Sequence, residues 1–132
     1  MIRSRLCVLA ENVVQDVQTN TISIFGIVEE MIAQGFPLFI PKVAFFVLWE
    51  RELTDPSRYD AEFSVTLNEQ RLHTVPVTMD FRDGRRHRSI VALQGIMIPQ
   101  PGQLTFSLRI QDVAEATYIF PVTAPQSTIT IQ

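Results

Sequence analysis

The stretch YDAEFSVTLN, residues 59–68, decides the fold class, because apolar and polar side chains alternate along it without interruption. A strand with one face in a core and the other in water sorts side chains in this way, since successive residues point to opposite faces. The same period of two returns in LTFSLRI, residues 104–110. We therefore expect a half-buried antiparallel sheet.

The composition indicates a single globular domain over residues 1–132. The chain is 46% apolar, has a formal net charge of -3 and contains one cysteine, Cys7. A domain of this length can fold without a disulfide or a metal, and we expect no cofactor. The apolar run at 6–10 is too short for a signal peptide, and no segment reaches the ~20 apolar residues of a membrane span. We expect a cytoplasmic protein without a membrane partner.

Turn residues divide the chain at short, regular intervals, as in a sandwich or a barrel. The run 72–81 contains Pro76, which lacks a backbone N–H, so this run should be an edge strand or carry a local break. Two prolines make 35–41 an irregular connection. We predict strands over 5–17, 21–32 (with Gly26 marking a bulge or a close backbone approach), 42–49, 59–68, 72–81, 88–98, 104–110 and 116–122, and a short alternating tail over 127–131 that can add a last strand. The expected fold is all-β, a mainly antiparallel two-sheet β-sandwich of about seven to nine strands.

Residues 42–49 have apolar side chains on both faces of the predicted strand. Only one face can contribute to a core between two sheets, so the other face needs a separate cover. A second copy of the chain is one candidate cover, and the segment 35–41 folded over this face is the other. The candidate interface residues are Ala44, Phe46 and Leu48 on the second face, with Phe36 and Phe39 beside it.

The densest group of charges is RDGRRHR, residues 82–88. Guanidinium groups offer planar, bidentate donors to anions, so a candidate anion site comprises Arg82, Arg85, Arg86, His87 and Arg88. The ordinary interpretation, which the pattern favours, is a solvated hairpin loop that turns at Asp83 and Gly84. The acidic net charge and the lack of Phe, Trp or Tyr within 82–88 argue against a nucleic-acid partner.

Catalytic patterns are missing from the sequence. His73 and His87 have no cysteine or carboxylate neighbours at metal-ligand spacing, and we expect no metal site. No Gly-x-Ser-x-Gly motif and no glycine-rich phosphate loop occurs. Cys7 lies among apolar residues, where a cysteine behaves as a small hydrophobe. We therefore expect a protein that is not an enzyme.

Four segments resemble a family of small bacterial proteins classed as a domain of unknown function. They are LCVLAE at 6–11, NTISIFGIV at 20–28, GFP at 35–37 and PGQLTF at 101–106. In the last segment Leu104 stands where the family more usually has an aromatic residue. The resemblance spans most of the chain and implies an immunoglobulin-like β-sandwich. It implies no activity, substrate or site residues.

Two functions follow as expectations. The first is a non-catalytic interaction or scaffolding module that associates with a protein partner or with itself, as a homo-oligomer, through 43–49. The alternative is a ligand-binding module that recognises a small anionic group through the loop 82–88.

Overall fold

The computed structural model describes residues 1–125, and in this part of the chain it contains nine strands and no helix. No segment of this part therefore forms a helix of the length and apolarity needed to cross a membrane. The strands are β1 (Arg3–Asp16), β2 (Thr21–Ile27), β3 (Met31–Ile32), β4 (Leu38–Glu50), β5 (Arg58–Leu67), β6 (Gln70–Asp80), β7 (Arg86–Ile98), β8 (Gly102–Ile110) and β9 (Ala114–Thr123). The predicted all-β class is confirmed.

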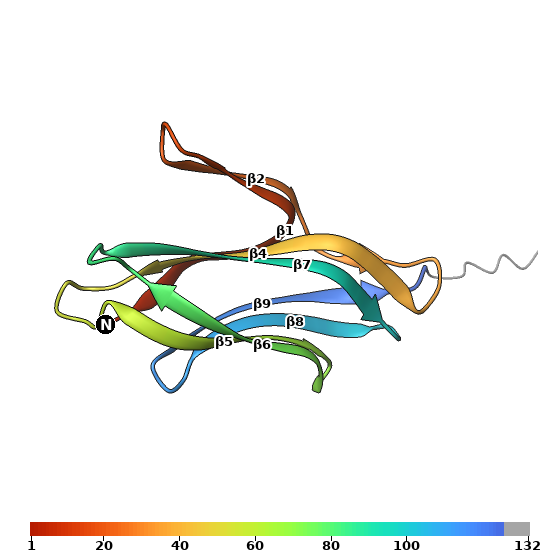
Figure 1. The fold of residues 1–132 in the computed structure, drawn as a ribbon. Helices are drawn as coiled ribbons and strands as arrows, with labels where there is room; N and C mark the ends of the chain where they lie inside the picture. Colours follow the sequence, from red (N-terminus) through yellow and green to blue (C-terminus); the bar gives the residue numbers. More distant parts are fainter. Residues whose placement is uncertain (126–132) are drawn as a thin grey trace, which may run out of the picture.

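The strands form two sheets. Sheet A has the order β2-β1-β4-β7, and sheet B has the order β3-β9-β8-β5-β6. Every pairing is antiparallel except that of the two-residue strand β3 with β9. Figure 1 shows β4 and β7 above the strands of sheet B, which curls like half of a barrel.

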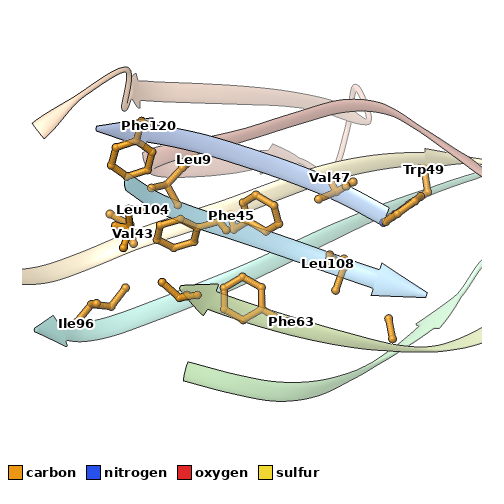
Figure 2. Close-up of a cluster of buried hydrophobic side chains, with 14 of the residues drawn as sticks. Leu9, Val43, Phe45, Val47, Trp49, Phe63, Ile96, Leu104, Leu108 and Phe120 are labelled. Atoms are coloured by element: carbon orange, nitrogen blue, oxygen red, sulfur yellow. The ribbon is translucent and has the colours of Figure 1, made fainter. Parts of the chain in front are cut away.

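One hydrophobic core lies between the two sheets. The ring of Phe45 in sheet A lies 5.6 Å from that of Phe63 and 5.9 Å from that of Phe106, both in sheet B. Along β4, the alternate residues from Val43 to Trp49 point into this core (Figure 2). The alternation of 59–68 behaves in the same way, since Phe63, Val65 and Leu67 are all buried. The alternation of apolar and polar residues therefore predicted correctly which side chains of these strands enter the core.

Three local predictions are confirmed. The first segment is a strand and forms a hairpin with β2. The strand that contains Pro76 is the edge of sheet B, and β8 and β9 pair as a hairpin around Asp112 and Val113. The predicted strand at 127–131 lies outside the described residues.

The prediction of one strand over 21–32 is wrong. This segment forms β2 in sheet A and β3 in sheet B, with residues 28–30 between them. Gly26 has φ +69, and a Cβ atom there would lie 2.8 Å from the Glu11 side chain. The glycine therefore marks a close approach of two strands at the end of β2, beyond which the chain crosses between sheets.

The prediction of an irregular connection over 35–41 is confirmed for 35–37 and wrong for 38–41, because β4 already begins at Leu38. Ile40 pairs with Ile96 and Lys42 pairs with Gln94, whereas Pro41 and Gly95 between them are unpaired. The proline therefore falls where the ladder is interrupted and its missing N–H is tolerated. Residues 38–41 therefore extend sheet A, and Phe36 packs against the main core, so the segment does not cover the outer face.

The loop 82–88 is not a hairpin loop, because β6 belongs to sheet B and β7 to sheet A. Arg86, His87 and Arg88 are already part of β7 and pair with β4. The charged segment therefore crosses from one sheet to the other at one end of the molecule.

Candidate functional site

A second, smaller apolar cluster lies on the outer face of sheet A. Phe46 pairs with Val8 in β1, and Ala44 pairs with Ala10. These four side chains point away from the main core, yet all of them are buried and Phe46 is only 2% exposed. Something in the single chain therefore covers the outer face.

The cover is the β1–β2 hairpin. Ala10 pairs with both Ala44 of β4 and Ile27 of β2, but beyond it β1 pairs only with β2. The hairpin thus leaves the sheet near the contact of Glu11 with Gly26 and rises above β4 and β7 (Figure 1). Ile22 and Ile24 face the same cavity as Phe46. The hairpin therefore covers the outer face of β4. The two covers expected from the sequence were different ones, a second subunit and the segment 35–41.

The tip of the hairpin is attached to β7. The guanidinium of Arg88 donates hydrogen bonds to Asn20 at its side-chain oxygen (3.1 Å) and at its backbone oxygen (2.6 Å). Asn20 has φ 57, a conformation that asparagine tolerates better than most residues. The Asp16 carboxylate accepts hydrogen bonds from the backbone N–H groups of Gln18 and Thr19. The hairpin is thus fixed at its base by strand pairing and at its tip by Arg88.

Between the hairpin and the sheet runs a groove of about 1040 Å³, which we call the hairpin groove. This volume is slightly above the range of about 300–1,000 Å³ typical of small-molecule sites. Along β4 its lining runs from Phe46 and Leu48 to the level of Glu50, which pairs with Arg86, so one end is mainly apolar and the other is charged. The lining residues are Leu6, Gln15, Asn20, Ile22, Ile24, Phe46, Leu48, Thr78, Asp80, Phe81, Arg82, Arg86, His87 and Arg88.

The charged end of the groove is built by the crossing between the sheets, and Arg51 anchors it. Arg51 is only 4% exposed. Its Nε donates to the Gly84 oxygen and its Nη1 to the Asp55 oxygen, both at 2.8 Å, and its guanidinium lies 5.4 Å from the centre of the Phe81 ring. A buried guanidinium satisfied in this way holds two loops in one arrangement.

The turn at the crossing has an unusual backbone. Arg82 and Asp83 both have positive φ, 50 and 62, and the N–H of Gly84 donates to the oxygen of Phe81 at 2.9 Å. Turns of this kind prefer asparagine and glycine at the two central positions. Here the N–H of Arg82 donates to the Asp80 carboxylate and that of Asp83 to the Ser57 hydroxyl, which supports the turn. The position of Arg82 is therefore fixed by its surroundings.

The structure divides the predicted anion-site residues between two cavities. Arg82, Arg86, His87 and Arg88 line the hairpin groove. Arg85 instead lines a separate cavity of about 480 Å³, together with Arg86 and residues 50–54. Four of the five residues predicted from the sequence thus lie along one groove, whereas Arg85 lies in the other cavity.

The arginines of the groove differ in how far they are already engaged. Arg88 holds Asn20, and Arg86 lies 3.5 Å from the Glu50 carboxylate. Glu50 also contacts Arg3 at 2.9 Å and Arg5 at 3.4 Å, and the hydrogen bond from Arg3 lowers the pKa of this carboxyl. Within residues 1–125, no ion pair or hydrogen bond engages the guanidinium of Arg82.

His87 contributes a neutral ring near neutral pH. Burial lowers its pKa, against the opposing influence of a hydrogen bond with the Asp80 backbone oxygen. That oxygen lies 3.1 Å from Nδ1 and can only accept, so Nδ1 carries the proton in the neutral ring. The ring also lies 5.5 Å from that of Phe81. His87 therefore adds a flat surface to the groove and can add a charge in acid.

The candidate interface residues are distributed over different environments. Ala44 and Phe46 are buried under the hairpin, and Leu48 is partly buried in the groove. Phe36 packs against the main core, whereas Phe39 is 56% exposed. Of the five, Phe39 is the one that presents a large apolar surface to solvent.

The nucleophile and metal candidates are weak in the described part of the chain. Burial raises the pKa of the Cys7 thiol to about 11, which suppresses the reactive thiolate. Among residues 1–125, no three histidine, cysteine or acidic side chains are grouped so as to hold a metal ion.

Sequence reasoning missed the two residues that organise this site. In the sequence, nothing distinguishes Arg51 from a solvated charged residue at the end of a strand, and nothing distinguishes Asn20 from any other loop residue. The one available signal was indirect: the apolar outer face of 43–49 required a cover.

Comparison with known proteins gives a family and nothing closer. No curated protein and no solved structure matches the chain. A family model matches residues 5–128, nearly the whole sequence. The chain therefore belongs to the family of unknown function DUF6941.

Proposed function

We propose that this protein is a non-catalytic binding module that holds an anionic ligand in the hairpin groove. The observation that carries the proposal is the lining itself, which contains three arginines and one carboxylate in a chain whose net charge is -3. Guanidinium groups at a concave, partly desolvated site attract anions more strongly than the same groups on an open surface. Arg82 is the principal donor, because its guanidinium has no partner among the described residues.

The test is calorimetric titration with a homologous series of anions, from methyl phosphate to octyl phosphate, at low and high salt. Arg82→Gln should weaken binding roughly tenfold or more, the effect of losing one charge-assisted hydrogen bond. Arg71→Gln is the matched control, because Arg71 is exposed on β6 and does not line the groove. Binding should also weaken with salt. If no member of the series binds, or if Arg82→Gln and Arg71→Gln bind equally well, the proposal is wrong.

A second function, self-association, is supported by the free edge of sheet A. β7 is thirteen residues long and, among the described residues, pairs only with β4. Beside this edge, the paired residues Phe39 and Met97 are 56% and 49% exposed. An unpaired edge next to exposed apolar side chains favours strand addition by a second copy. Sedimentation velocity tests this: Phe39→Asp should turn a dimer into a monomer, and a wild-type protein that is monomeric at every concentration would refute it.

We also propose an immunoglobulin-like arrangement of the strands. In immunoglobulin constant domains the sheets are ABED and CFG. Taking β1, β4, β5, β7, β8 and β9 as A, B, C, E, F and G gives A-B-E in sheet A and G-F-C in sheet B. β6 takes the place of strand D in chain order, but it lies beside C in sheet B, whereas D of a constant domain lies beside E. This order supports the likeness, and an experimental structure of the protein would test it.

A further inference from the structure

We infer that the ligand of the hairpin groove is an amphiphile, with one anionic head at Arg82 and Arg86 and an alkyl chain between the hairpin and sheet A. The inference rests on the proposed function and adds the chemical class of the ligand. It follows from three properties of the groove: its apolar end, its charged end and its roof, the hairpin, which is attached at both ends.

The apolar end presents surface that the protein leaves uncovered. Leu6 faces the groove and is 46% exposed, and Ile22, Ile24 and Leu48 around it are only partly buried. The floor and the roof of this end are thus aliphatic. An alkyl chain placed there removes apolar surface from water at about 0.8 kcal/mol for each methylene.

The charged end belongs to the same groove as the apolar end. Phe46 and Leu48 lie on β4, and Glu50 follows on the same face of the same strand, 3.5 Å from Arg86. Arg86 and Arg82 line the same groove as Leu48. A single molecule can therefore contact the aliphatic surface and the guanidiniums together. A small anion would leave the apolar end exposed, and an uncharged alkane would leave Arg82 without a partner.

The roof distinguishes a free amphiphile from a membrane surface. Arg88 holds the hairpin tip through two hydrogen bonds, and the base is held by the pairing of Ala10 with Ile27. The aliphatic surface therefore lies beneath a strand pair and does not protrude from the molecule. A monomeric amphiphile can enter such a groove, whereas a bilayer cannot reach its floor beneath the attached hairpin.

The experiment compares methyl, butyl and octyl phosphate, each below its micelle concentration, with octyl glucoside as the uncharged control. Affinity should rise about threefold to fourfold for each buried methylene, and octyl glucoside should bind far more weakly than octyl phosphate. Equal affinity for methyl and octyl phosphate would overturn the inference while leaving the proposed anion site intact. No binding of any phosphate would instead refute the proposed function.

Variants localise the alkyl chain. Leu6→Thr should weaken octyl phosphate binding severalfold and leave methyl phosphate binding unchanged. Ile119→Thr is the matched control, because Ile119 is a comparably exposed strand residue (51%) that does not line the groove. Equal effects of the two substitutions on octyl phosphate binding would overturn the placement.

A vesicle arm separates the two sources of such a ligand. Vesicles of phosphatidylcholine and phosphatidic acid should not sediment the protein, whereas monomeric octyl phosphate should bind. Co-sedimentation that Leu6→Thr does not reduce would overturn the inference in favour of surface binding to a membrane.

Discussion

The two faces of β4 carry similar apolar side chains, but the elements that cover the two faces differ. Phe45 on the inner face is fully buried among residues of both sheets, in contact with Phe63 and Phe106. Phe46 on the outer face is almost as well buried, but it lies under a single hairpin at the border of a large groove. Exposed fraction alone does not distinguish them. What differs is the freedom of the surroundings, because the inner cover is a five-stranded sheet and the outer cover is a two-stranded hairpin attached at its two ends.

The largest expected effect is on the inner face. Phe45→Ala should lower the free energy of unfolding by about 3–5 kcal/mol, because the rigid sheets around it cannot close the resulting cavity. The measurement is chemical denaturation followed by circular dichroism. A loss below ~2 kcal/mol would show that the two sheets adjust to each other more freely than a close-packed core should.

Phe46→Ala should cost less, about 2–3 kcal/mol, although the side chain removed is the same. The lost transfer free energy remains, but the hairpin can settle toward the sheet and reduce the cavity term. The informative quantity is the difference between the losses in unfolding free energy of the two variants, measured in the same denaturation experiment. Equal losses for Phe45→Ala and Phe46→Ala would mean that the hairpin is as rigid as sheet B.

The same contrast explains what the sequence could predict. Alternation along 59–68 and 104–110 is a local pattern, so it identified the strands and the side chains that enter the core. It also showed that 43–49 needed a cover on both faces. It could not identify the hairpin as that cover, because the fold-over depends on where β1 leaves the sheet, near the contact of Glu11 with Gly26.

The candidate site was predictable to a similar extent. The arginines of 82–88 were conspicuous in the sequence, and four of the five residues proposed there line the groove. Their division between two cavities was not predictable, since it depends on β6 and β7 belonging to different sheets. The buried anchor Arg51 was missed because a charged residue at a strand end is normally solvated.

A smaller effect is expected at the hairpin tip. Arg88→Gln removes both hydrogen bonds to Asn20, but this contact is exposed to solvent, so the free energy of unfolding should change by no more than about 1 kcal/mol. Amide hydrogen exchange should nevertheless accelerate in 13–24 and stay unchanged in β5 and β8. Asn20→Gly retains the backbone acceptor and the positive φ, so it should have a weaker effect. Unchanged exchange in Arg88→Gln would show that the tip is held by other contacts.

The smallest effect concerns the titration of His87 on the rim of the groove. Burial lowers its folded-state pKa below the ordinary value of 6.5, so in mild acid the unfolded chain binds a proton before the folded one does. The free energy of unfolding should therefore fall as the pH drops below 6.5 and become level again once the folded state is also protonated. Glu50 and Asp55 also have lowered pKa values, but these act at more acidic pH, below their ordinary values of 4.5 and 3.8.

His87→Gln should therefore flatten the pH dependence of stability just below pH 6.5 while leaving the decline at more acidic pH in place. Denaturation curves at successive pH values measure both regions in one series. Because His87 lies at the start of β7, beside Trp49 and Phe81 and away from the Val91 that pairs with Phe45, its titration should leave the difference between wild type and Phe45→Ala unaffected. If the unfolding free energy of His87→Gln depends on pH below 6.5 as steeply as that of the wild type, His87 has the same pKa in the folded and unfolded states. The His87 ring would then be better solvated than its packing against Phe81 indicates.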